Sequence, residues 1–367
     1  MTRRMTAAGL LLAAMGTAQT AGLLEREAAG WVETRTGFFS PGALSRLRVE
    51  SRGLVIVQGG GGNQIAWRVK NHIRVERESD ARRILGEYAP RLRSGGGSAL
   101  VSMPQSGDSM VYSELEVRVP SGVRFAAVSN ALGDILLRDL PLEVDAETGG
   151  GRVDADRLGG RLAARSSGGE ILLGHVGGEV RATTGGGAIQ ARSLGADSWL
   201  ETAGGEIFVE RSEGSVSAIS GAGGVQVMRA RGAVNARTAG GSIKVLEAGG
   251  GVRCESMGGG IRLAGAGNLF ASTLLGAIFA ELLAGGSADS ILETESGDIT
   301  VLIPSRLAVT VQAVNDSGRD ARIMTEFPEI HVRGGGGRMV ASGALNGGGP
   351  LLKVAAAKGT IYLKRQR

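Results

Sequence analysis

Apolar residues recur through the middle of this chain at a fixed interval of 18 residues. A Gly-x-Ile/Val pattern supplies one apolar rank, formed by Ile135, Val153, Ile171, Ile189, Ile207, Val225, Ile243 and Ile261. A second rank follows nine residues later and consists of Val144, Leu162, Val180, Val216, Val234 and Val252. A fixed period of this kind is typical of proteins built from stacked structural repeats.

Two further ranks follow the second one at steps of two residues. The first contains small residues, namely Ala146, Ala164, Ala182, Ala218, Ala236 and Cys254. The next contains hydroxyl groups, on Thr148, Ser166, Thr184, Thr202, Ser220, Thr238 and Ser256. Because residues two apart lie on one face of a strand, all three ranks are predicted to point inward. The inward hydroxyls are expected to satisfy backbone groups at the corners, or one another.

Each interval therefore predicts two short strands separated by glycine-rich turns, which together form one coil of a parallel β-solenoid. An antiparallel meander would have no reason to keep an 18-residue period, and the glycine content excludes a helical solenoid. The regular repeat covers about residues 131–263. We expect an all-β fold of ten to twelve coils, which at ~4.8 Å per coil gives a rod of about 50 Å.

The flanks extend this solenoid. A short amphipathic helix is expected near residues 79–93, covering one end or side, with one face formed by Ala81, Ile84, Leu85, Tyr88 and Leu92. After the last regular coil the apolar rank continues at Ile278 and Ile299, 17 and then 21 residues further on. We interpret residues 38–367 as one elongated domain and residues 19–37 as its lead-in.

Residues 1–18 have the pattern of a secretory signal peptide. Arg3 and Arg4 precede a short apolar stretch, and small residues follow before Gln19, the expected mature N-terminus. Export to the periplasm, the outer surface or the extracellular space is therefore predicted, and we expect no transmembrane segment after cleavage because no later window is long and apolar enough.

Composition narrows the function classes. The 63 glycines in 367 residues compare with roughly 26 at average usage, and the single cysteine excludes an intrachain disulfide. The net charge of +5 includes Arg3 and Arg4, and charges of both signs are interspersed. No basic stripe with interleaved aromatics is present, so nucleic acid is not an expected partner.

We expect no catalytic residues, no metal site and no cofactor, and hence no enzyme. A calcium β-roll requires Gly-Gly-x-Gly-x-Asp, whereas the positions after Gly-Gly here hold Glu170, Ala188, Glu206, Val225 and Ser242. The uniform short turns leave little room for the cleft of a carbohydrate-active β-helix enzyme, whose site would have to lie within 70–112 or 312–345. Cys254 is expected to be an inert core residue.

Three residues are candidates for partner contact. At Trp199 either the strand slips by one residue and buries the ring, which is the favoured interpretation, or the ring stands outward where it could stack on a sugar or a partner. Leu275 and Phe279 belong to an unusually apolar segment, and an exposed apolar patch there would indicate a partner site.

The strings Ser167–Ile171, Ala203–Ile207 and Ser296–Val301 resemble the T/S-x-G-G-x-I-x-V element of the bacterial family called putative adhesins. The resemblance covers roughly residues 38–367. It implies an exported β-solenoid with no known enzymatic activity and an inferred adhesion role, and it transfers no catalytic or ligand-binding residue.

The leading hypothesis is a non-enzymatic, exported structural or adhesin-like binding protein of the bacterial envelope. Its expected partner is a cell-surface glycan or an envelope protein. The alternatives are an envelope scaffold or sensor accessory that contacts a protein through residues 269–283 and, less favoured, a carbohydrate-active β-helix enzyme.

Overall fold

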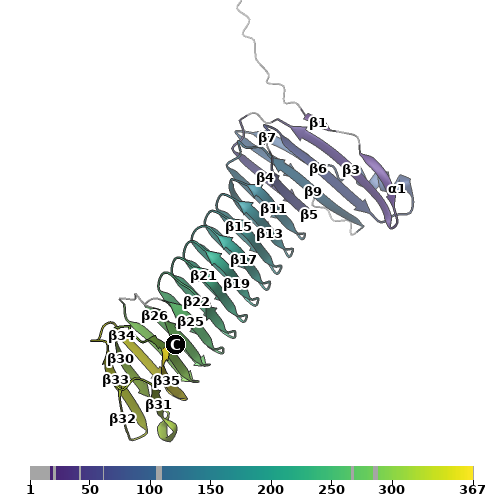
Figure 1. Cartoon of the computed structure of the whole chain (residues 1–367). Coiled ribbons are helices and arrows are strands. Elements are labelled where there is room, and N and C mark those ends of the chain that lie inside the picture. Colours follow the sequence, from purple (N-terminus) through teal and green to yellow (C-terminus); the bar gives the residue numbers. More distant parts are fainter. Residues whose placement is uncertain are drawn as a thin grey trace, which may run out of the picture.

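The chain forms a rod of stacked coils in which each coil contributes one strand to each of two long sheets (Figure 1). The computed structural model describes residues 17–19, 22–40, 43–60, 62–104, 110–265, 268–283 and 288–366. Up to residue 16, the predicted signal peptide lies outside the described residues. Within the described parts of the chain, no helix is long and apolar enough to cross a membrane.

The repeat predicted from the sequence is confirmed strand by strand. Sheet A contains β11 (Ile135–Leu140), β13 (Val153–Leu158), β15 (Ile171–Val176), β17 (Ile189–Leu194), β19 (Ile207–Ser212), β21 (Val225–Ala230), β23 (Ile243–Val245), β25 (Ile261–Gly265), β27 (Ile278–Leu282) and β29 (Ile299–Pro304). Sheet B contains β10 (Phe125–Asn130), β12 (Glu143–Thr148), β14 (Leu162–Ser166), β16 (Val180–Thr184), β18 (Ser198–Thr202), β20 (Val216–Ser220), β22 (Val234–Thr238), β24 (Val252–Ser256), β26 (Leu269–Leu275) and β28 (Ser290–Ser296).

Neighbouring strands pair in parallel with their apolar ranks aligned. Ile135 is opposite Val153, 18 residues on, and the same step repeats to Ile261. The predicted change of step is also confirmed, because Ile261 pairs with Ile278 and Ile278 with Ile299. The inward residues from both sheets form one continuous apolar core.

The inward hydroxyl groups hydrogen-bond each corner to the coil before it. Thr184 Oγ1 donates to the carbonyl of Gly169 at 2.8 Å and accepts from the N–H of Gly187 at 3.3 Å. The hydroxyls that donate to a glycine carbonyl in this way are those of Thr148, Ser166, Thr184, Thr202, Ser220, Thr238, Ser256, Thr273 and Thr294. The hydroxyls therefore satisfy backbone groups, one of the two expected arrangements.

Thr184→Val is expected to destabilise the protein by about 1–2 kcal/mol, because it leaves the Gly169 carbonyl and the Gly187 N–H of a partly buried corner without their partner. Thr183→Val is the matched control, since Thr183 is adjacent on the outer face of β16 and should change stability by less than about 0.5 kcal/mol. Chemical denaturation of the two variants measures the difference. Equal losses of stability in the two variants would contradict the hydrogen-bonding role of the Thr184 hydroxyl.

The N-terminal end of the solenoid departs from chain order. The strands β4 (Arg46–Ser51) and β5 (Leu54–Gly59) form a layer that lies between two later layers. On one side this layer pairs with β10 and β11, and on the other with β8 (Ser98–Ser102) and β9 (Val111–Val119). All four pairings are parallel.

The C-terminal end repeats this interleaving. The last described layer, β34 (Leu351–Ala356) and β35 (Thr360–Gln366), pairs in parallel with β28 and β29. Its other side pairs with β30 (Val309–Asn315) and β31 (Arg322–Thr325), which precede it in the chain. Together the described residues make fourteen two-strand parallel layers, or roughly 60 Å at ~4.8 Å per layer. This exceeds the expected ten to twelve coils because the flanks supply four layers.

Antiparallel strands close both ends of the rod. At the N-terminal end β6 (Ile65–Ile73) pairs with β9 and with β3 (Gly30–Phe39), which also pairs with β1 (Thr17–Gln19) and β2 (Leu23–Glu27). On sheet B the end strands are β7 (Arg91–Gly95), next to β8, and the hairpin of β32 (His331–Gly335) and β33 (Arg338–Leu345), next to β30. A 3-10 turn, η1 (Gly318–Asp320), precedes β31. Apart from β1, of which Thr17 and Ala18 lie in the predicted signal peptide, these strands cover both sheets at the N-terminal end and sheet B at the C-terminal end. The C-terminal edge of sheet A is β31, which pairs with β35.

The expected helix is present but shorter than predicted. It spans α1 (Glu78–Leu85) and packs Ala81 and Leu85 against Ile73, beside the N-terminal antiparallel strands (Figure 1). Leu92, expected on its apolar face, belongs to β7 instead. Gly86, a poor helix former, follows the last helical residue, and Pro90 prevents the helix from continuing to residue 93.

Candidate functional site

The three predicted contact residues lie on different parts of the rod. Trp199 is on the outer face of sheet B, and Phe279 is on the outer face of sheet A. Leu275 ends β26 at the corner between the sheets and is 63% exposed. Since the two outer faces point away from a shared core, the three residues do not form one surface.

The favoured interpretation of Trp199, a slipped strand that buries the ring, is wrong. Ser198 is buried at the position that valine holds in neighbouring coils, where it pairs with Val180 and Val216, and Trp199 is 39% exposed. A slip of one residue would also turn Leu200 outward. Burial of Leu200 at the next inward position therefore keeps the register and leaves the tryptophan outside.

The Trp199 ring is held by two contacts on the outer face. Its Nε1 donates to Glu201 Oε2 at 3.1 Å. The guanidinium of Arg181, on the preceding strand β16, lies 5.7 Å from the ring centre. The ring is thus an ordered wall that remains partly open to solvent.

Beside Trp199 the outer face of sheet B is hollowed into a groove of about 680 Å³. It extends along the rod to Phe270 on β26. Its lining residues are Glu179, Asp197, Ser198, Trp199, Ser215, Val216, Ser217, Ala233, Val234, Asn235, Gly251, Val252, Arg253, Asn268 and Phe270. This volume is in the range of small-molecule sites.

Sequence reasoning missed most of this groove. Its wall and floor come from the outward position that follows the first inward residue of each sheet-B strand. That position reads Arg181, Trp199, Ser217, Asn235, Arg253 and Phe270. Aligning the repeat on the outward positions would have revealed Ser217, Asn235 and Arg253 between the two aromatic residues Trp199 and Phe270.

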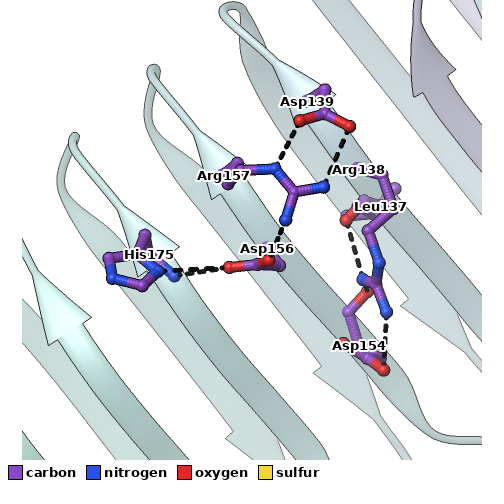
Figure 2. Close-up of polar contacts among 7 residues, drawn as sticks. All are labelled: Leu137, Arg138, Asp139, Asp154, Asp156, Arg157 and His175. Carbon is purple, nitrogen blue, oxygen red and sulfur yellow. Dashed lines mark hydrogen bonds and ion pairs between the residues drawn. The ribbon is translucent and has the colours of Figure 1, made fainter.

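The outer face of sheet A carries a different arrangement, a chain of ion pairs across three layers (Figure 2). Arg157 contacts both Asp139 oxygens, at 2.5 and 3.1 Å, and reaches Asp156 at 2.5 Å. Asp156 also accepts a hydrogen bond from the backbone N–H of His175 at 3.0 Å. Nearby, Arg138 pairs with Asp154 at 2.8 Å. The charges in this cluster therefore compensate one another.

The hydrogen bonds from Arg157 lower the pKa of Asp139 and raise that of Arg157. Burial opposes ionisation of Asp156, but the hydrogen bonds from His175 and the charge of Arg157 outweigh it and lower its pKa. Lowered carboxyl pKa values keep this cluster ionised at neutral pH. Because Arg157 is already paired with Asp139 and Asp156, the cluster is a structural network and not an open anion site.

Arg157→Gln is expected to lower the melting temperature slightly at pH 7 and by less at pH 2, well below the ordinary pKa of an aspartate. The folded-state pKa of Asp139 lies below its ordinary value of 3.8, so the pair stabilises the fold above that value and its contribution is lost as the pH falls. Thermal unfolding at both pH values tests this, with Asp139→Asn expected to follow the same pattern. A decrease of equal size at the two pH values would refute it.

Other candidate chemistry is sparse in the described residues. No group of three or more His, Cys, Asp or Glu side chains there is placed to hold a metal ion. Cys254 is buried in the small inward rank, and burial raises the pKa of its thiol to about 12, which fits an inert core residue. The described parts of 70–112 and 312–345 mainly form the end strands and α1.

An apolar patch occupies the corner beyond the groove. Leu275 lies next to Met257 of the preceding coil, and its N–H donates to the Met257 carbonyl at 2.9 Å. Met257, Leu274 and Leu275 are all large exposed apolar residues, at 55%, 49% and 63%. Phe279 is not part of this patch, since it is half-buried beneath the guanidinium of Arg262, 4.8 Å from the ring centre.

Comparisons with known proteins give distant likenesses only. No family model and no curated protein matches the chain. Among solved structures, a "putative cell adhesion protein" from Clostridium sporogenes is 9% identical, with a TM-score of 0.20, over 91% of this chain and 100% of that one. A "putative adhesin" from Bacteroides fragilis is 10% identical, with a TM-score of 0.22, over 91% and 97%.

A third similar structure, a "putative adhesin" from Parabacteroides merdae, is 10% identical, with a TM-score of 0.34, over 74% of this chain and 96% of that one. These descriptions agree with the family resemblance predicted from the sequence. At such identities and TM-scores, the likenesses by themselves carry no argument about what this chain does.

Proposed function

We propose that this chain is a non-enzymatic, exported, adhesin-like binding protein of the bacterial envelope. The observation that carries the proposal is the sheet-B groove, where an exposed, ordered tryptophan stands beside a floor of small residues. The strands beneath it are hydrogen-bonded on both sides, so the backbone of the groove is fixed in shape before any ligand arrives. Preorganisation lowers the entropic cost of binding.

The rest of the rod supports this proposal as a presenting scaffold. Fourteen stacked layers with one continuous core form a stiff support that holds the groove in the C-terminal half of the rod, three layers or more from the end. Export rests on the signal-peptide pattern of residues 1–18, and N-terminal sequencing of the secreted protein is expected to begin at Gln19.

The test is direct binding. Mature protein on a biosensor surface is exposed to cell-envelope fractions, purified peptidoglycan and extracellular-matrix proteins, with serum albumin as the inert control. Saturable binding to at least one of the first three is expected. If all of them behave like albumin, the binding function is wrong.

A second candidate function is contact with an envelope protein through the corner patch of Met257, Leu274 and Leu275. The exposure of these three apolar side chains on two neighbouring coils is the observation that favours it. Leu275→Ser is expected to abolish recovery of a cross-linked envelope partner. Phe279→Ser, on the outer face of sheet A, should leave that partner in place. An unchanged partner in Leu275→Ser would reject this candidate.

A further inference from the structure

The floor of the sheet-B groove consists of small, mostly polar side chains between two bulky walls. Ser217 on β20 and Asn235 on β22 occupy the two layers that separate Trp199 from Arg253. These two walls are three strand spacings apart, roughly 14 Å. The groove therefore offers a polar base of the width of a short chain of sugar rings.

Each wall presents a flat group. Since β16 and β20 flank β18 on opposite sides, Arg181 contacts the Trp199 ring from the side away from Ser217. At the other wall the Arg253 guanidinium lies 4.1 Å from the centre of the Phe270 ring and pairs with Glu255 at 2.5 Å. A flat aromatic wall and a flat guanidinium wall thus enclose the floor.

The floor also contains oxygens without a protein partner. Ser217 Oγ and Asn235 Oδ1 are shielded from solvent and accept or donate no hydrogen bond within the described residues. Polar atoms in this state cost free energy. In their present rotamers these oxygens face away from the groove opening, so a ligand with several hydroxyl groups would supply the missing partners only after both side chains change rotamer.

A peptide strand does not suit this face. β18, β20 and β22 are each hydrogen-bonded to parallel neighbours on both sides, so no free strand edge is available for a peptide to extend the sheet. Recognition here therefore does not proceed by strand addition.

A polyanion does not suit it either. The rim carries Glu179 and Asp197 as well as Arg253. The Asp197 carboxylate already accepts a hydrogen bond from the Ser215 N–H at 2.8 Å, and Arg253 is paired with Glu255. Mixed and compensated charge gives no field of one sign to attract a charged polymer.

We propose that this groove binds an uncharged oligosaccharide, with a sugar ring stacked on Trp199 and its hydroxyl groups bonded to Ser217 and Asn235. The inference rests on the proposed binding function and names its ligand class. An aromatic face suits the C–H face of a pyranose ring, and hydroxyl and amide groups suit its hydroxyls.

Isothermal titration with chitotetraose, cellotetraose, maltotetraose and mannotetraose tests the proposal on the mature protein. At least one of them should bind saturably, and Trp199→Ala should weaken that binding at least tenfold while Trp199→Phe retains most of it. Phe208→Ala is the matched control, because Phe208 is an aromatic side chain of similar exposure on the outer face of sheet A. Unchanged circular dichroism and melting temperature in each variant establish folding.

The inference would be overturned by no binding of any tetrasaccharide, by equal binding by Trp199→Ala, or by equal weakening by Phe208→Ala. Binding restricted to sulfated glycans or to peptides would also overturn it. If the tetrasaccharides fail while deglycosylated matrix or envelope proteins still bind saturably, the binding function stands and only the ligand class is wrong. If nothing binds, both proposals fail.

Discussion

Gly169→Ala is expected to destabilise the protein by roughly 3 kcal/mol, a large effect for adding one methyl group. A Cβ at this corner would collide with the backbone carbonyl of Gly151 in the preceding coil. Backbone stacked in register cannot move aside without disturbing both neighbouring layers. Since Gly169 has an unexceptional backbone conformation, the loss is due to this collision and not to a left-handed φ angle.

Gly168→Ala is the matched control, because a Cβ at Gly168 meets no atom within 4 Å. This variant should change stability by less than about 0.5 kcal/mol, or stabilise slightly by restricting the unfolded chain. Denaturant titration of both variants gives the comparison. Similar midpoints for the two would show that the coils do not approach as closely at this corner as their stacking indicates.

The same collision recurs at one glycine in each coil. The glycines at which an added Cβ would collide are Gly151, Gly169, Gly187, Gly205, Gly223, Gly241 and Gly259. In each case the Cβ would meet the carbonyl of the corresponding glycine one coil earlier. Any of these positions therefore serves to repeat the experiment, and the high glycine count is largely a requirement of stacking.

Removal of residues 351–367 is expected to unfold the C-terminal end while leaving the regular repeat intact. The deletion takes away the layer of β34 and β35 and with it the buried side chains of Leu352, Val354, Ile361 and Leu363. Each contributes roughly 1.5–3 kcal/mol. Strands β30 and β31 then have no parallel partner and are separated from β28 and β29 by a missing layer.

Hydrogen exchange measured by mass spectrometry should show fast exchange across residues 290–345 and unchanged protection across 125–256. Repeats stabilise mainly their immediate neighbours, so the damage stays local. Removing only Gln366 and Arg367 is the control and should preserve protection at both places. Protection of 290–345 in the longer deletion would mean that the end layers fold independently of β34 and β35.

The sequence predicted the repeat well because the 18-residue period also fixes the register in which neighbouring strands pair. Each inward residue pairs with the residue 18 positions on, so counting along the chain finds the partner. The 18-residue period does not identify the partners at the two ends of the rod, where Ile299 pairs with Ile361 and Val55 pairs with Ile135. Only the packing of the whole chain selects those partners, and the interleaved layers were therefore not predicted.

The candidate site was predicted less well, for a related reason. Trp199 was identified as unusual, but its orientation depends on Leu200 and Thr202, whose inward positions set the register of the entire strand. Phe270 lies at the same outward position of its strand as Trp199, but the sequence did not indicate this. The step from Arg253 to Phe270 is 17 residues, one fewer than the regular period. Outer-face positions follow no apolar pattern of their own. The groove can therefore be recognised only when the coils are aligned on their inward residues and the outward residues are then compared.

The interleaved C-terminal end has a consequence for the order in which the chain is completed. During synthesis β30 and β31 emerge before β34 and β35, yet the latter must separate them from β28 and β29. If β30 and β31 docked early, they would occupy the place that belongs to strands not yet made. Assembly of this end must therefore wait for the last strands to emerge or undo a premature docking, which makes it a late step in the maturation of the protein.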